Sequence, residues 1–76
     1  MSFKRGDFVR LKEGEAGRVG VVWQIDLKSL ASIGVYWRGE SETSRMQQAH
    51  EPSDLQLVPR EVVPEYAMDL KWSLGL

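Results

Sequence analysis

His50, the single histidine of the chain, is the side chain best suited to acid–base chemistry near neutral pH. Ser53 and Asp54 follow it closely and complete the residue types of a hydrolytic triad. Three residues within one turn rarely form the two hydrogen bonds that a triad needs, from nucleophile to base and from base to orienting group. We therefore predict that His50 lies at the surface or in an interface. Asp54 is expected to cap a turn, or a single 3₁₀ turn, ahead of Leu55.

Metal and thiol chemistry find no support in the sequence. The chain has no cysteine, which excludes disulfides, thiolate zinc sites and cysteine nucleophiles, and one histidine cannot form a multi-histidine cluster. Glu40 and Glu42 lie two residues apart beside Gly39 but lack the further oxygen ligands of a calcium loop. We expect no cofactor, no metal and no enzymatic activity.

Length and composition indicate one small globular domain. The chain has 76 residues, of which 42% are hydrophobic and 28% are charged. No apolar run approaches the roughly 18 residues of a membrane span, and no signal peptide opens the chain. We therefore expect a soluble, cytoplasmic protein that does not bind a membrane.

The charges are distributed unevenly along the chain. Residues 1–38 contain seven cations and four anions, whereas residues 39–76 contain three cations and seven anions. The basic half offers a possible nucleic-acid surface, although the sequence pI of about 5.7 is low for a phosphate-binding domain. The candidate nucleic-acid residues of this alternative are Arg5, Arg10, Lys12 and Arg18.

Alternating apolar residues predict about five short strands, over residues 8–12, 18–25, 32–38, 43–49 and 55–58, with Pro59 ending the last. Turns are expected at 13–17, 39–42 and 51–54, and a connecting loop with a possible helical turn at 26–31. Gly20, inside the second strand, indicates a bend or a close approach of backbone. The pattern predicts an all-β fold, a small barrel or sandwich of about five strands over residues 1–60 followed by a C-terminal extension over 61–76. One dry interior is expected to contain Val19, Val21, Trp23, Ile33, Val35 and Trp37.

The C-terminal extension contains two conflicting signals. Its apolar residues recur with a period of two, which favours an extended strand, whereas its composition and Pro64 favour a short helix. We favour the strand. Either way, we expect this apolar segment to pair with another chain or to pack across its own barrel as a lid. The residues concerned are Tyr66, Met68, Leu70, Trp72 and Leu74.

Two glycine-containing motifs resemble a known family. The pattern Gly6-Asp7-x-Val9-Arg10, followed by Gly14-x-x-Gly17-x-Val19, resembles the start of an SH3-like barrel of the KOW or Tudor type. The resemblance covers residues 6–37, about half the chain, and implies RNA or ribosomal proteins as partners of the loop between the first two strands. That loop is usually basic but here contains Glu13 and Glu15, which would repel phosphate.

A second resemblance uses the segment Ala49-His50-Glu51-Pro52-Ser53-Asp54-Leu55-Gln56-Leu57-Val58-Pro59 together with Gly6-Asp7-Phe8-Val9-Arg10. These residues are similar to the plasmid-borne type II dihydrofolate reductases, tetramers of SH3-like barrels. Gln56 and Leu57 match the glutamine and isoleucine of the family's active pore. Val58 stands where the family has tyrosine, and Leu11, beside Lys12, where it has lysine. The resemblance implies the architecture and a tendency to self-associate along the strand of Gln56.

Aromatic residues complete the candidate interaction surface. Tyr36 alternates away from Trp37 and is expected to face outward, where it could form a patch with Phe8, unless Phe8 is buried. We predict a non-enzymatic protein-interaction module of SH3-like type that binds a protein partner or itself as a homo-oligomer. The alternatives are an RNA- or ribosome-associated KOW-like module and a reductase-like enzyme.

Overall fold

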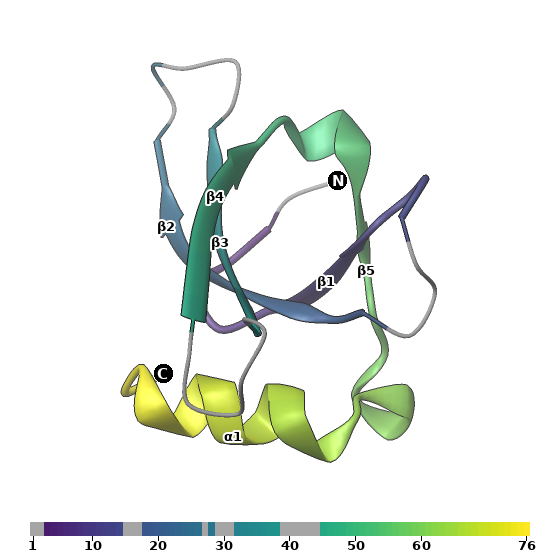
Figure 1. Ribbon diagram of the computed structural model, residues 1–76. Coiled ribbons are helices and arrows are strands. Elements are labelled where there is room, and N and C mark those ends of the chain that lie inside the picture. The colour runs from purple at the N-terminus through teal and green to yellow at the C-terminus, as the bar shows by residue number, and fades with distance from the viewer. Residues whose placement is uncertain (1–2, 15–17, 27, 29–31, 39–44) are drawn as a thin grey trace.

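The computed structural model describes residues 3–14, 18–26, 28, 32–38 and 45–76, except the side chains of residues 45 and 46. Five antiparallel strands form one sheet in the order β4-β3-β2-β1-β5 (Figure 1). A 3₁₀ turn, η1, precedes β5, and a second one, η2, leads into the helix α1. The elements are β1 (Phe8–Leu11), β2 (Gly20–Ile25), β3 (Ile33–Arg38), β4 (Arg45–His50), η1 (Pro52–Asp54), β5 (Leu55–Leu57), η2 (Arg60–Val62) and α1 (Glu65–Ser73).

The all-β prediction is confirmed. All five predicted strands are present, including the polar fourth one, and the predicted 3₁₀ turn ahead of Leu55 is η1. Within the described ranges β4 pairs only with β3 and β5 only with β1, so these pairings leave the sheet open and do not close a barrel. The predicted turns at 13–17 and 39–42 and the loop at 26–31 lie wholly or partly outside the described residues.

Two apolar clusters lie on opposite faces of the sheet. We call them the interior cluster and the helix-side cluster. Because adjacent residues of a strand point to opposite faces, β1 contributes Val9 to one cluster and Phe8 to the other. The interior cluster consists of Phe3, Val9, Val22, Ile33, Val35, Trp37 and Leu55. The helix-side cluster consists of Phe8, Val19, Val21, Ala67 and Leu70.

The single interior predicted for β2 and β3 is therefore wrong. Val19 and Val21 belong to the helix-side cluster, and Val22 takes the place expected for them in the interior. The pairing of β2 with β3 shifts by one residue between Val22 and Gln24, which breaks the alternation. As a result Ile25 packs against the interior cluster, whereas Trp23 lies half-buried over Gly34 on the other face.

Gly20 provides the close approach that the sequence indicated. A Cβ atom at this position would lie 2.6 Å from Cγ1 of Val35 and 2.7 Å from Cε3 of Trp37. Both neighbours are almost fully buried, so neither can move aside without disturbing the interior cluster. The missing side chain at Gly20 thus lets the Trp37 ring lie against β2.

The C-terminal extension forms the helix α1, so the extended strand favoured from its period of two is wrong. Pro64 lies at the N-terminal cap, and its carbonyl accepts hydrogen bonds from the amides of Ala67 and Met68. A helix brings Tyr66, Leu70 and Leu74 to one side, since they are four residues apart. The helix turns this side toward the sheet and leaves Trp72 exposed.

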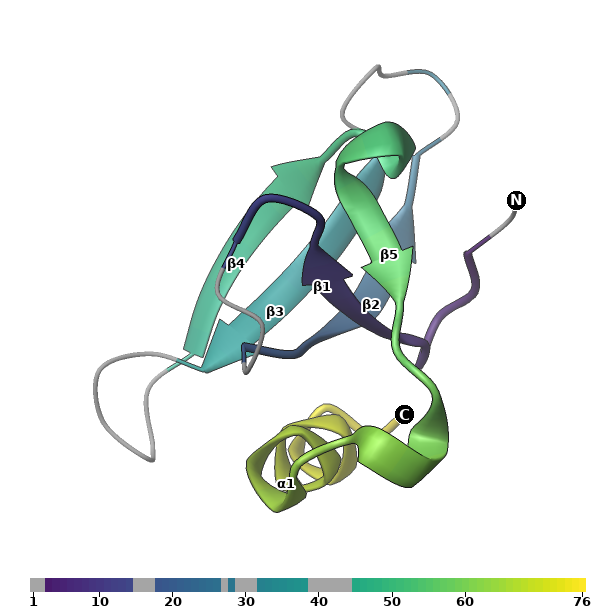
Figure 2. The same cartoon turned by 90° about the vertical axis from the view of Figure 1, so that its right-hand side faces the viewer.

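The helix covers its own sheet, as Figures 1 and 2 show from two directions. Ala67 is fully buried and Leu70 is 7% exposed, and both lie against the helix-side cluster. Tyr66 attaches the helix to β2 because its hydroxyl oxygen accepts a hydrogen bond from the amide of Val19 at 2.8 Å. The sequence left open whether this segment packs across its own domain as a lid or pairs with another chain. In the structure it packs across its own sheet, as the lid alternative has it. Trp72 remains 72% exposed.

No helix in the described part of the chain is long and apolar enough to cross a membrane.

Candidate functional site

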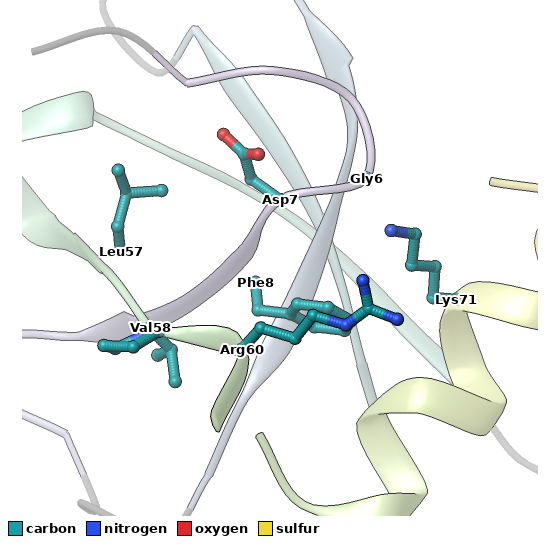
Figure 3. Close-up of a pocket in the computed structure, with 8 residues that line it drawn as sticks. Gly6, Asp7, Phe8, Leu57, Val58, Arg60 and Lys71 are labelled. Atoms are coloured by element: carbon teal, nitrogen blue, oxygen red, sulfur yellow. The ribbon is translucent and has the colours of Figure 1, made fainter. Parts of the chain in front are cut away.

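A cleft of about 420 Å³ lies where the start of β1, the end of β5 and α1 come together (Figure 3). Its apolar lining comes from Phe8, Leu57, Val58 and Pro59. Phe8 is buried, and Leu57 is 36% exposed. The polar lining residues are Asp7, Arg60 and Lys71, and Gly6 completes the wall.

Two cations from different elements reach into this cleft. Figure 3 shows Arg60, from η2, and Lys71, from α1, extending toward the same end of it. The Nζ atom of Lys71 lies 5.2 Å from the centre of the Phe8 ring, which holds the ammonium group by a cation–π contact. Asp7 brings the one carboxylate, and its Oδ2 accepts a hydrogen bond from the amide of Lys4 at 2.8 Å. The cleft therefore combines an apolar lining with a net positive charge.

The strand β5 lies beside the cleft, and among the described residues one of its edges has no partner strand. It pairs with β1 in the register Val9↔Leu57, Arg10↔Gln56 and Leu11↔Leu55. The amide of Val58 donates to the carbonyl of Phe8 at 2.9 Å, which shows that Val58 directs its amide toward β1. In antiparallel pairing every second residue turns its amide and carbonyl the other way. Leu57 therefore directs its backbone amide and carbonyl away from β1.

The candidate interaction residues differ in their surroundings. Gln56 is exposed on β5, and its Oε1 accepts a long hydrogen bond of 3.5 Å from Nη1 of Arg10. Phe8 is buried beneath α1 and does not form part of an exposed patch, so the second of the two alternatives for this residue is correct. Trp72 is exposed on the far side of the helix. Four tail residues pack toward the sheet, Leu70 within the helix-side cluster and Tyr66, Met68 and Leu74 against it.

Tyr36 faces outward from the interior as expected, but it is half-buried. Its ring lies 5.3 Å from that of Trp23 at an angle of 49°, and it also packs against the helix-side cluster. Trp23 borders a second, smaller hollow of about 270 Å³ whose other lining residues are mostly polar. The Nε1 atom of Trp23 is buried and has no hydrogen-bond partner among the described residues. The exposed patch predicted from Tyr36 and Phe8 is thus absent from the described surface.

The four candidate nucleic-acid residues occupy different surroundings. Arg5 and Lys12 are exposed, whereas Arg10 is half-buried beside Gln56. The guanidinium group of Arg18 lies 5.6 Å from the centre of the Trp37 ring. None of the contacts described here joins these four cations into one phosphate-binding site.

His50 is half-buried and takes part in the packing of Trp37. Its Nε2 accepts a hydrogen bond of 3.1 Å from Nε1 of Trp37, and the two rings meet edge to face at 5.6 Å. Burial lowers the pKa of His50, and the negative charge of Asp54 opposes this shift. A protonated imidazole has no acceptor nitrogen, so the bond requires the neutral form. His50 therefore helps to fix the position of the buried Trp37 ring.

We expect acid to weaken the fold through His50. Because the pKa of His50 is lowered in the folded protein, its contribution to stability is complete above the unfolded pKa of about 6.5. The contribution falls as the pH drops from there through the folded pKa. Between pH 7.5 and 5.5 the Tm of the unchanged protein should decrease more than the Tm of His50→Gln. The glutamine has no titrating group, and its amide oxygen can still accept the hydrogen bond from Trp37. Equal decreases in both proteins would contradict this role.

The sequence did not reveal the cleft as a site. Arg60, which follows Pro59, and Lys71, inside α1, are eleven residues apart, and the turn η2 and the packing of α1 bring them together. Gln56 and Leu57, the residues that match the reductase pore, lie on β5, and Val58 packs against the helix-side cluster. No protein-family model, no curated protein and no solved structure matches this chain.

Proposed function

We propose that this protein is a non-enzymatic protein-interaction module with an SH3-like arrangement of strands. It binds an extended segment of a partner protein along the edge of β5 and in the cleft at the end of that strand. The observation that carries the proposal is that Leu57 belongs to both features, since its backbone amide and carbonyl point to the edge that has no partner strand in the described ranges, and the residue also lines the cleft.

A peptide strand can extend a sheet wherever an edge offers unpaired amide and carbonyl groups. In β5 these groups include the amide and carbonyl of Leu57. Main-chain hydrogen bonds would supply affinity, and the apolar lining formed by Phe8, Val58 and Pro59 would select the partner's side chains. The SH3-like assignment rests on the strand order and on the 3₁₀ turn directly before the last strand.

The test is selection of peptides from two displayed libraries of random decapeptides. One library presents free C-termini, and the other presents free N-termini. Selected peptides should shift the NMR signals of Leu57 and Val58 and should slow hydrogen exchange at the Leu57 amide. Failure to select any peptide, or binding that leaves these amides unaffected, would contradict the proposal.

A matched pair of variants isolates the main-chain bond. Leu57→Pro removes the amide that faces the edge and leaves the Val58 bond to β1 in place, and proline is tolerated at sheet edges. Leu57→Ala shortens the side chain and keeps the amide. We expect Leu57→Pro to bind selected peptides about tenfold more weakly than Leu57→Ala, the equivalent of one main-chain bond. Equal affinities, with both variants folded by circular dichroism, would contradict pairing at β5.

A further inference from the structure

Resting on the proposed function, we infer that the cleft binds the C-terminal carboxylate of the partner chain. The partner strand then runs parallel to β5 and ends beside Arg60 and Lys71. Three features of the cleft lead to this conclusion, namely its charge, its apolar lining and its position in the fold.

The charge of the cleft favours an anion. Arg60 and Lys71 line it from η2 and α1, and neither forms an ion pair with any carboxylate in the described ranges. The cation–π contact with Phe8 holds Lys71 in place without neutralising it. Asp7, the carboxylate of the cleft, has one oxygen engaged by the amide of Lys4. Two cations against one carboxylate leave a positive site that a carboxylate ligand would neutralise.

The lining favours a carboxylate attached to an apolar side chain. Phe8, Leu57, Val58 and Pro59 surround the space next to the cations, and about 420 Å³ accommodates a terminal residue with its side chain. A phosphate group would find two cations but no use for this apolar surface. A leucine or valine with a free carboxylate would satisfy both.

The position favours a chain end over the middle of a chain. Beyond Val58 the chain leaves the sheet at Pro59, and η2 and α1 lie past the end of β5 (Figures 1 and 2). A partner strand that follows β5 in the same direction reaches these elements one or two residues after Leu57. A strand that terminates there needs no turn, and its carboxylate comes to lie between Arg60 and Lys71.

The experiment uses one acetylated pentapeptide of alternating threonine and valine that ends in leucine. It is titrated into the labelled protein once with a free C-terminal carboxylate and once as the C-terminal amide. We expect the free acid to bind about tenfold more tightly than the amide, because charge-assisted hydrogen bonds are lost in the amide. Leu57, Val58 and Lys71 should show the largest NMR shifts.

Charge variants provide the second arm. Arg60→Gln combined with Lys71→Met should remove the preference for the free acid, while Met keeps an apolar stem over Phe8. The control, Arg5→Gln combined with Lys12→Met, makes the same change in net charge at exposed cations elsewhere and should keep the preference. If the control variant loses the preference equally, the preference for the free acid comes from the overall charge of the protein and not from the proposed site.

The outcomes separate this inference from the proposed function. Equal binding of acid and amide, or no binding of the acid at millimolar concentration, overturns the C-terminal site. If library peptides still protect the Leu57 amide in that case, the interaction module stands without it. If no peptide of any kind contacts Leu57, both proposals fail.

Discussion

Trp37→Ala is expected to cost about 3–5 kcal/mol of stability, the range for removing a large aromatic side chain from a packed core. Trp37 is 1% exposed, lies against Gly20 and Val35, and donates a hydrogen bond to His50. A domain of this length has roughly 4–11 kcal/mol of stability in total, so this variant should lose a large part of it. Urea unfolding followed by circular dichroism measures the difference.

Trp72→Ala is the matched control for that variant. Trp72 is 72% exposed, and an exposed substitution of this kind usually changes stability by about 0.5 kcal/mol or less. The expected losses of stability at the two tryptophans thus differ by several kcal/mol, because one side chain is buried and the other is exposed. Similar losses for both would mean that Trp72 is covered in solution, by the chain itself or by a second copy.

Leu70→Ala is expected to destabilise the protein by about 2–5 kcal/mol. Leu70 is 7% exposed and lies between α1 and the sheet, in one cluster with Phe8 and Val21. Alanine keeps the helix propensity but leaves a cavity under α1. The measurement is again urea unfolding.

Asp69→Ala serves as the control on the same helix, because Asp69 is exposed and its replacement by alanine leaves the packing intact. A change of less than about 0.5 kcal/mol is expected there. If Leu70→Ala were as mild as Asp69→Ala, α1 would not be docked on the sheet, and the cleft that depends on Lys71 would not exist in the form described.

The strand positions and the faces of β1 and β3 could be predicted from the sequence, whereas the faces of β2 could not. Strand positions follow from alternation and turn residues, both of which are local. The face on which a residue lies depends on every residue before it in the strand, so the shift between Val22 and Gln24 was enough to place Ile25 on the face opposite Trp23. Nothing in the local pattern of Val21, Val22 and Trp23 signals that shift.

The tail was mispredicted for a different reason. Its period of two was real, but helix propensity and Pro64 supported the competing interpretation, and burial against the sheet decided between them. On the helix Ala67 and Leu70 belong to the helix-side cluster, and Tyr66, Met68, Leu74 and Leu76 pack against it. Only a knowledge of which surface lies nearby, here Phe8 and Val21, distinguishes the two.

The candidate site was only partly accessible to sequence reasoning. Gln56 and its strand were singled out, and that strand does present an edge. Arg60 and Lys71 carry no motif, since an arginine after a proline and a lysine in a helix are ordinary in any sequence. Their joint position depends on how η2 turns the chain and where α1 lies, which are tertiary properties.

Residue-resolved hydrogen exchange in the free protein is the most direct measurement of the open β5 edge. The amide of Val58 should be protected by its bond to Phe8, whereas the adjacent amide of Leu57 should exchange rapidly at every protein concentration. Protection of both amides at all concentrations would show that another strand already occupies this edge, and the proposed binding surface would not be available.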